Sequence, residues 1–149
     1  MHPTAAPTTL PLDEQLCLAL YRASRAMTAR YRPLLGELGL TYPQYLVMAV
    51  LWEDGPTSVG GIGARLGLES STLSPLLKRL EAMGLAQRRR GTEDERTVEV
   101  TLTPAGEAAR ERAVHIPPTI CAATGLEPAD SARLVEELQQ LVRALSADD

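Results

Sequence analysis

Two cysteines are the most reactive side chains of this sequence, and they stand far apart in it. Cys17 lies in the segment LDEQLCLALY, near the start of an expected helix, and Cys121 lies in PPTICAATG. A cysteine thiolate can attack an oxidant and become a sulfenic acid, whereas a buried thiol is only a small apolar side chain. The residues around Cys17 fit both interpretations, so the rest of the chain must decide between them.

The surroundings of the two cysteines argue against a metal centre and favour reduced thiols. No CxxC pair or cysteine–histidine cluster is present, and His2 and His115 are isolated, so we expect neither a metal nor a cofactor. The start of the chain lacks the pattern of a secretory signal, and no apolar run approaches the roughly 20 residues of a membrane span. We therefore expect a cytoplasmic protein that does not associate with membranes and keeps its thiols reduced at rest.

A second set of polar residues has the types and spacing of a DNA-binding surface. Ser70, Ser71 and Thr72 form an expected cap cluster for a helix that then carries leucines at helical spacing. The face opposite the leucines has hydroxyls near its start and two cations further along, which suits the base edges and phosphates of a major groove. This face comprises Ser71, Thr72, Pro75, Lys78 and Arg79.

A basic hairpin is expected directly after this helix. The apolar residues of VEVTL alternate with polar ones as in a half-exposed strand, and LAQRRR supplies the other arm, with residues 91–96 as the tip. At the tip, the Asp94 carboxylate is placed to hold the Arg96 guanidinium extended for a minor groove. The net charge of −4 argues against a uniformly basic nucleic-acid binder but not against a local basic surface. The hairpin cations are Arg88, Arg89, Arg90 and Arg96.

The elements that position these residues are mostly helices, because apolar residues recur at helical spacing over much of the chain. Asp13 is the expected N-cap of the first helix, and Pro33 is expected to interrupt or kink it. The helix that starts at Pro43 is apolar nearly all round, so it should be the buried centre. Pro117 and Pro118 should bend the chain. The expected helices span about residues 13–31, 43–53, 59–66, 70–83, 104–116 and 127–146.

The expected elements are mostly helices, with one hairpin directly after a helix-turn-helix. This order predicts a mainly α fold, a winged helix-turn-helix with a two-stranded wing. The long first and last helices carry apolar faces that so small a module cannot cover, so we expect them to pair with a second copy in an intertwined homodimer. We expect residues 1–11 to be a flexible arm and 12–149 to be a single domain. Its winged helix should span about 42–104, and its dimerisation helices about 12–38 and 104–147.

Three segments and the helical ends carry a resemblance to a known family. The segments are LTYPQYLVMAVLWE, LGLESSTLSPLLKRLEAMGL and RRRGTEDERTVEVTLTPAG. From about residue 12 onward, the chain resembles the MarR family of bacterial winged-helix repressors. Within that family, EQLCLALYRASRAMTARYRPLL followed by TYPQY resembles the organic-hydroperoxide-sensing, OhrR-type branch, and Cys121 resembles the second cysteine of its two-cysteine members. The resemblance implies a repressor of a double-stranded DNA operator rather than an enzyme.

The resemblance also implies roles for the cysteines and tyrosines. An organic hydroperoxide would oxidise Cys17, an intersubunit disulfide with Cys121 would follow, and the operator would be released. Family members carry thiol-positioning tyrosines at the places of Tyr31 and Tyr42. Tyr31 lies about 21 Å from Cys17 along one helix at 1.5 Å per residue, so this contact would have to come from the other subunit. Tyr21, one turn from Cys17, is its same-helix neighbour, with a role either at the thiol or in interface packing.

Three other functions fit parts of the sequence. A MarR-type repressor that is released by a small aromatic ligand would leave the cysteines passive. A two-cysteine peroxidase would need a thioredoxin-like βαβ pattern, which is not recognisable, and would give the wing arginines no role. A protein–protein adaptor built on a winged helix would show no salt-dependent affinity for DNA. The hydroperoxide-sensing repressor is the function that we predict.

Overall fold

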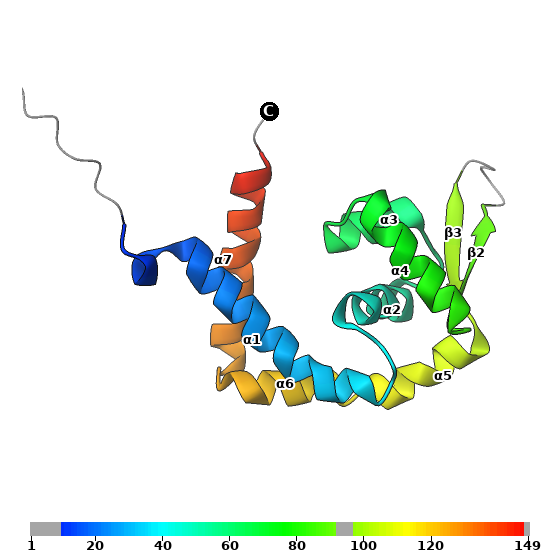
Figure 1. Cartoon of the computed structure of the whole chain (residues 1–149), viewed down its shortest axis with the longest axis horizontal. Helices are drawn as coiled ribbons and strands as arrows, with labels where there is room; N and C mark the ends of the chain where they lie inside the picture. Colours follow the sequence, from blue (N-terminus) through cyan, green and yellow to red (C-terminus); the bar gives the residue numbers. More distant parts are fainter. Residues whose placement is uncertain (1–9, 92–96, 148–149) are drawn as a thin grey trace, which may run out of the picture. The chain divides into compact units, whose positions relative to one another are not determined.

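The computed structural model describes residues 10–91 and 97–147, in two compact units, one ending at Val114 and the other starting at His115 (Figure 1). The fold is mainly helical with one small sheet, as predicted. No helix within these ranges is long and apolar enough to cross a membrane. The elements are α1 (Leu16–Gly36), α2 (Tyr42–Asp54), β1 (Thr57–Ser58), α3 (Val59–Leu66), α4 (Ser70–Ala82), β2 (Ala86–Arg90), β3 (Val98–Leu102), α5 (Pro104–Ala113), α6 (Ile116–Thr124) and α7 (Pro128–Ser146).

The first helix, α1, starts and ends later than the sequence predicted. Leu12–Glu14 form a short 3-10 turn, and Gln15 is the N-cap residue, so the predicted cap at Asp13 is wrong. Asp13 is part of the turn and is therefore not in the extended conformation that an N-cap residue adopts. Pro33 lies inside the last turn, and the helix ends at Gly36. The chain thus continues in helical conformation for about one turn beyond the missing N–H.

The second helix, α2, is the buried centre of the first unit, as its apolar sequence predicted. A capping box fixes its start: the Gln44 backbone N–H donates to Thr41 Oγ1 at 3.4 Å, and the Thr41 backbone N–H donates to Gln44 Oε1 at 3.0 Å. Pro43 occupies the first turn, where its missing N–H costs nothing. The buried apolar side chains of α2 are Tyr45, Val47, Met48, Val50 and Leu51.

The predicted helix-turn-helix is formed by α3 and α4. Gly67 ends α3 in the left-handed region, with a φ of +68°. At Gly63 a Cβ would lie 2.6 Å from the Leu68 carbonyl oxygen, so only glycine allows this close approach. The N-cap of α4 is Glu69, which is extended, so the predicted cap cluster at 70–72 lies in the first helical turn instead. The buried leucines of α4 are Leu73, Leu77 and Leu80.

The predicted wing hairpin is formed by β2 and β3, and a third strand joins it. The two strands run antiparallel, with Ala86 opposite Leu102 and Arg88 opposite Val100. The two residues of β1 pair with the other edge of β3, which gives the strand order β1-β3-β2. A strand of two residues shows no alternation, which is why the sequence did not predict it. In Figure 1 the wing strands lie beside α4.

The first turn of α5 joins the wing to α2. Thr103 Oγ1 accepts from the Gly106 N–H at 3.0 Å and donates to the Gly84 carbonyl oxygen at 2.5 Å. A Cβ at Gly106 would lie 2.1 Å from the Leu85 carbonyl oxygen, so this approach also requires glycine. The Trp52 indole Nε1 donates to the Gly106 carbonyl oxygen at 3.0 Å. These bonds hold α2, β2 and α5 together at one junction.

The second unit consists of α6 and α7. Pro117 and Pro118 lie in the first turn of α6, where prolines are tolerated, and α6 is a helix that the expected spans did not include. Gly125, with a φ of +69°, ends α6. Helix α7 carries the predicted apolar row, but the row is poorly covered. Of the residues Leu134, Leu138, Leu141, Val142 and Leu145 that make up this row, Leu134, Val142 and Leu145 are between 44% and 72% exposed.

Candidate DNA-binding surface and thiol sites

The outward face of α4 carries the polar residues that the sequence singled out. Leu73, Leu77 and Leu80 point into the core with at most 1% exposure, so the opposite side faces solvent. Hydroxyls gather in the first turn and cations follow, an order that suits a helix entering a major groove by its N-terminal end. The exposed candidates on α4 are Ser70, Ser71, Thr72, Pro75, Lys78 and Arg79.

An open groove of about 400 Å³ lies between α4 and the wing. The starts of α3 and α4 form one side of it, and β2 and β3 form the other. Its polar lining includes Ser58, Ser70, Ser74 and Arg88. The wing flank of the helix-turn-helix is therefore polar and open to solvent, as a surface that meets a phosphate backbone must be.

The three consecutive arginines of β2 occupy different environments. Because successive strand residues point to opposite faces, Arg88 shares a face with Ala86, which is only 2% exposed. Arg88 Nε donates a charge-assisted hydrogen bond to Glu81 of α4. Arg89 and Arg90 are exposed. The sequence placed all three on a DNA-binding surface, whereas the structure brings Arg88 against α4.

The predicted wing-tip pair, Asp94 and Arg96, lies outside the described residues. At the base of the tip, the Gly91 N–H donates to the Thr97 carbonyl oxygen at 2.7 Å, which closes the hairpin there. The role of the pair in a minor groove stays a prediction.

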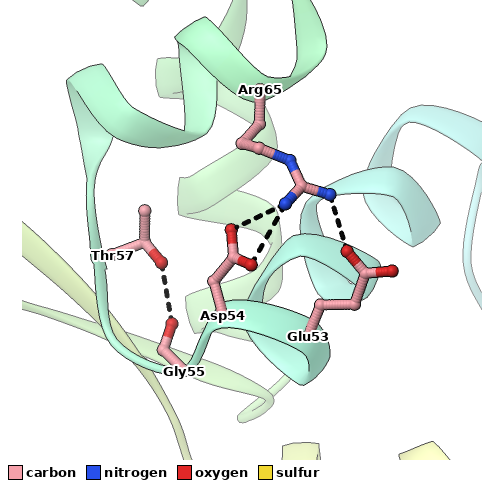
Figure 2. Close-up of polar contacts among 5 residues, drawn as sticks. All are labelled: Glu53, Asp54, Gly55, Thr57 and Arg65. Atoms are coloured by element: carbon pink, nitrogen blue, oxygen red, sulfur yellow. Dashed lines mark hydrogen bonds and ion pairs between the residues drawn. The ribbon is translucent and has the colours of Figure 1, made fainter.

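An ion-pair cluster fixes α3 against the end of α2 (Figure 2). The Arg65 guanidinium contacts both carboxylate oxygens of Asp54 at 3.1 Å and the Glu53 carboxylate at 2.6 Å. The hydrogen bond to Glu53 and the charges of Asp54 and Glu53 raise the pKa of Arg65, so it stays charged. Thr57 Oγ1 donates to the Gly55 carbonyl oxygen at 2.8 Å and stiffens the connection. The sequence did not reveal this cluster, because its members lie on two separate helices.

Cys17 lies in the first turn of α1, and its thiol is free and exposed. The ring of Tyr21, one turn further along, is 60% exposed, and the Arg25 guanidinium carbon lies 5.7 Å from the ring centre. An exposed thiol is accessible to an oxidant. Within a single chain Cys17 is thus not part of the core.

The structure brings Tyr31 of α1 and Tyr42 of α2 together within one chain, with ring centres 4.7 Å apart. Tyr45 joins them at 5.8 Å and 6.4 Å. Burial raises the pKa of Tyr42, and burial followed by the charge of Tyr42 raises the pKa of Tyr45. Both phenols therefore stay protonated at neutral pH and able to donate a hydrogen bond. Tyr45 was not predicted, although the spacing in YPQY puts it on the same helix face as Tyr42.

The aromatic cluster extends to Trp52, whose ring centre is 6.2 Å from that of Tyr45. The indole also makes the hydrogen bond to Gly106 at the junction with α5. The sequence gave no sign of this role, because the bond joins residues from distant parts of the chain. Aromatic packing thus connects the Tyr31–Tyr42 pair to the junction that holds the wing.

A cavity of about 450 Å³ opens beside Tyr42, between α1 and α2. Leu35, Leu40 and Pro43 give it apolar walls, and the Arg32 side chain adds a cation. A cavity of this size and lining suits a small organic molecule with an acidic group.

Cys121 lies near the end of α6 in the second unit, and its thiol is also free and exposed. Its carbonyl oxygen accepts a hydrogen bond from Thr124 Oγ1 at 2.6 Å, which helps to close the helix end. The predicted pairing with Cys17 joins two different units and stays a prediction. In residues 10–91 and 97–147, no group of three or more histidines, cysteines or carboxylates is placed to hold a metal ion.

Comparison with known proteins gives relatives over most of the chain. A family model described as "Transcriptional regulator SarA/Rot" matches residues 29–113. The "Organic hydroperoxide resistance transcriptional regulator" of Bacillus subtilis is 47% identical over 136 residues, which are 91% of this chain and 88% of that protein. The chain is therefore similar to a curated regulator along nearly the full length of both.

Solved structures of two regulators are similar to this chain. Reduced AbfR of Staphylococcus epidermidis bound to DNA has a TM-score of 0.76 and 37% identity, over 90% of this chain and 94% of AbfR. The disulfide-formed AbfR has a TM-score of 0.61 and 35% identity, over 92% of this chain and 93% of AbfR. BpsR of Bordetella bronchiseptica is a protein whose DNA binding is regulated by 6-hydroxynicotinic acid. Its structure has a TM-score of 0.79 and 28% identity, over 95% of this chain and 100% of BpsR.

Proposed function

We propose a function from the premise that this chain belongs to the SarA/Rot-type family of winged-helix transcriptional regulators and is therefore not an enzyme. The predicted resemblance to MarR-type, hydroperoxide-sensing regulators is confirmed, while its two-cysteine detail stays a prediction. We propose that the protein is a cytoplasmic repressor that binds an operator as a homodimer. An organic hydroperoxide oxidises Cys17, and the oxidised protein leaves the DNA.

The observation that carries the proposal is an exposed Cys17 thiol at the start of α1 in a chain that is 47% identical to an organic hydroperoxide resistance regulator. The Cys17 thiolate attacks the terminal peroxide oxygen, and the O–O bond breaks. The sulfur becomes a sulfenic acid, and the alkoxide leaves and takes a proton to become an alcohol. The phenols of Tyr31 and Tyr42 are the proposed hydrogen-bond donors that hold the thiolate.

DNA binding is proposed for α4 and the wing. Exposed hydroxyls and cations on α4 would read the major groove, and Arg89 and Arg90 would meet the backbone. Asp94 and Arg96 are proposed for the minor groove. The similarity to AbfR, whose solved structure is bound to DNA, supports this use of the fold.

The second step of the switch is proposed to be a disulfide between subunits. The Cys121 thiol would attack the sulfenic sulfur of Cys17 in the partner copy, so that a disulfide forms and water leaves. The bond needs Cα atoms within about 7 Å, so its formation would move helices and change the spacing of the two α4 helices. The similarity to disulfide-formed AbfR supports such a state.

A second candidate function is release by a small aromatic acid with passive cysteines. The cavity beside Tyr42, with Arg32 in its lining, and the similarity to BpsR favour it. Such a ligand would release DNA equally from a chain without either cysteine, which separates it from the redox switch.

A gel shift tests the proposal. Reduced protein is mixed with the DNA upstream of its own gene, and about one equivalent of an organic hydroperoxide is added, which suffices because one thiol reacts once. Loss of the shifted band, followed by its return with dithiothreitol, is the expected result. A band that persists at excess hydroperoxide would contradict redox sensing and favour the second candidate.

A further inference from the structure

Arg88 differs from Arg89 and Arg90 because its guanidinium is engaged by a carboxylate of α4. We propose that the Glu81–Arg88 ion pair is a positioning device that sets the angle of the wing relative to α4, and that Arg88 does not itself contact DNA. The inference rests on the proposed DNA-binding function and adds a role for a carboxylate on the DNA-binding helix.

The strand register directs Arg88 inward. Arg88 lies opposite Val100 of β3, and paired residues of an antiparallel ladder share one face of the sheet. Val100 is 0% exposed and Ala86 is 2% exposed, so this face packs against the core and α4. The side chains of Arg88 and Glu81 are only 30% and 34% exposed.

Glu81 lies on the flank of α4 that faces the wing rather than on the outward face. It comes seven residues, about two helical turns, after Ser74, which lines the groove between α4 and the wing. A carboxylate on the outward face would repel phosphates. On the wing flank, its charge is instead neutralised by Arg88.

The pair supplies a second fixed point between α4 and β2. The first is the turn at Gly84, where φ is +75° and the Leu85 N–H donates to the Leu80 carbonyl oxygen at 3.0 Å. The ladder with β3 and the buried Ala86 also hold the base of the wing. The ion pair lies further along β2 and adds a contact with α4 there.

A small change of angle would matter for binding. Residues 85–91 of the wing span roughly 20 Å at 3.3 Å per residue, so a rotation of about 15° moves the tip by about 5 Å. That distance is close to the width of a minor groove, about 6 Å. A wing without its second fixed point would therefore lose alignment with the groove while α4 stays in place.

The opposite interpretation is that Arg88 contacts a phosphate and Glu81 merely competes for it. The two interpretations predict opposite signs for Glu81→Gln, an isosteric change that removes one negative charge. If Glu81 positions the wing, the change weakens DNA binding. If Glu81 competes with DNA, the change strengthens binding.

The test measures the affinity of the reduced full-length protein for a duplex that the wild type selects from a random-sequence pool. Glu81→Gln, Arg88→Gln and the double variant are each expected to bind about two- to fivefold more weakly, with the double no weaker than the singles, because all three lose the same pair. Glu69→Gln, which removes a charge at the start of the same helix, is the matched control and should not weaken binding.

The salt dependence of DNA affinity shows whether Arg88 contacts a phosphate directly. Loss of one phosphate contact lowers the slope of log affinity against log salt by about 0.9, which is the expected result for Arg79→Gln. The slope measured for Arg88→Gln should equal that of the wild type. Thermal unfolding of each variant checks that it is folded. If Arg88→Gln does not fold, the direction of the change in DNA affinity of Glu81→Gln alone decides between the two interpretations.

Three results would overturn the inference while leaving the proposed function intact: tighter binding by Glu81→Gln, additive losses in the double variant, or a lower salt slope for Arg88→Gln. A wild-type protein that selects no duplex would overturn the proposed function, and the inference with it.

Discussion

Cys17 and the tyrosine pair carry different parts of the proposed chemistry. The thiol is the group that reacts, and the phenols are the donors that can hold its anionic form. Tyr31 and Tyr42 lie 4.7 Å apart, so they would act as one unit. Because Tyr31 is too far along α1 to reach Cys17 of its own chain, we propose that this unit acts on the thiol of a second copy.

The buried phenols predict a loss of stability in alkali. Burial raises the pKa of Tyr42 above the ordinary value of 10.0, so the folded state keeps a proton that the unfolded state loses. The stabilising contribution is complete below pH 10.0 and falls as the pH rises towards the folded-state pKa. Tyr42→Phe should therefore flatten the decline of unfolding free energy above that pH.

Urea unfolding of Tyr42→Phe and wild type at about pH 8 and about pH 11 measures this effect. Tyr21→Phe is the control, because Tyr21 is 60% exposed. Equal declines in wild type and Tyr42→Phe would show that Tyr42 titrates as in the unfolded chain.

At the scale of elements, the junction of α2, wing and α5 joins the aromatic cluster to the DNA-binding surface. Thr103 caps α5 and bonds to the Gly84 carbonyl at the start of the wing, while Trp52 bonds to Gly106. A movement at the tyrosines therefore has a continuous set of packed groups through which to reach the wing.

Thr103→Val should destabilise the protein, because it removes the cap and the bond to Gly84 while keeping the shape of the side chain. Loss of an N-cap costs about 1 kcal/mol, and the unpaired carbonyl adds to that, so a loss of about 1–2 kcal/mol in unfolding free energy is expected. Thr103→Ser keeps the hydroxyl and is the matched control. Equal stability of the two variants in urea would contradict the account of this junction.

The sequence predicted most helices because their signals are local. Thr103 stands immediately before Pro104, Thr41 stands two residues before Pro43, and both threonines cap helices in the structure. The leucine spacing of α4 indicated its buried face. The first cap, at Asp13, was wrong because a 3-10 turn uses the same residues. The two residues of β1 are too short to show a pattern.

The environments of single side chains were harder to predict than the elements. Three successive arginines read as one basic patch, yet strand alternation turns Arg88 towards Glu81. The pairings Arg65–Asp54 and Trp52–Gly106 join residues of different elements, so no local pattern announces them. Alternation applied to β2 would have separated Arg88 from Arg89.

At the scale of the whole molecule, the exposed apolar row of α7 indicates that a second copy of the chain covers it. Val142 and Leu145 are 61% and 72% exposed, and on the N-terminal helix Leu16 is 57% exposed. Rows of this kind are rare on monomers and common at interfaces. We propose that they pair in the homodimer.

Val142→Glu should weaken this dimer. A charge placed in an apolar interface costs at least the roughly 1.4 kcal/mol that corresponds to a tenfold rise in the dissociation constant. Sedimentation equilibrium measures the change. Gln140→Glu, on the opposite face of α7, is the control and should leave the dimer intact; equal effects of the two substitutions would place the interface elsewhere.

Cys121→Ser should abolish the proposed covalent dimer after hydroperoxide treatment, because it removes the thiol that we propose resolves the sulfenic acid. The Cys17 sulfenic acid should still form and can be trapped with a dimedone-type reagent. A non-reducing gel gives the readout. The same dimer band in the variant would exclude Cys121 as the partner.

The most direct test of the central claim is a titration of operator-bound protein with an organic hydroperoxide, followed by fluorescence anisotropy of labelled DNA. Wild type should release the DNA near one equivalent per subunit and bind again after dithiothreitol. Cys17→Ser should bind the same DNA with unchanged affinity and show no release. Release of the Cys17→Ser variant at the same hydroperoxide concentration would contradict the claim that this thiol is the sensor.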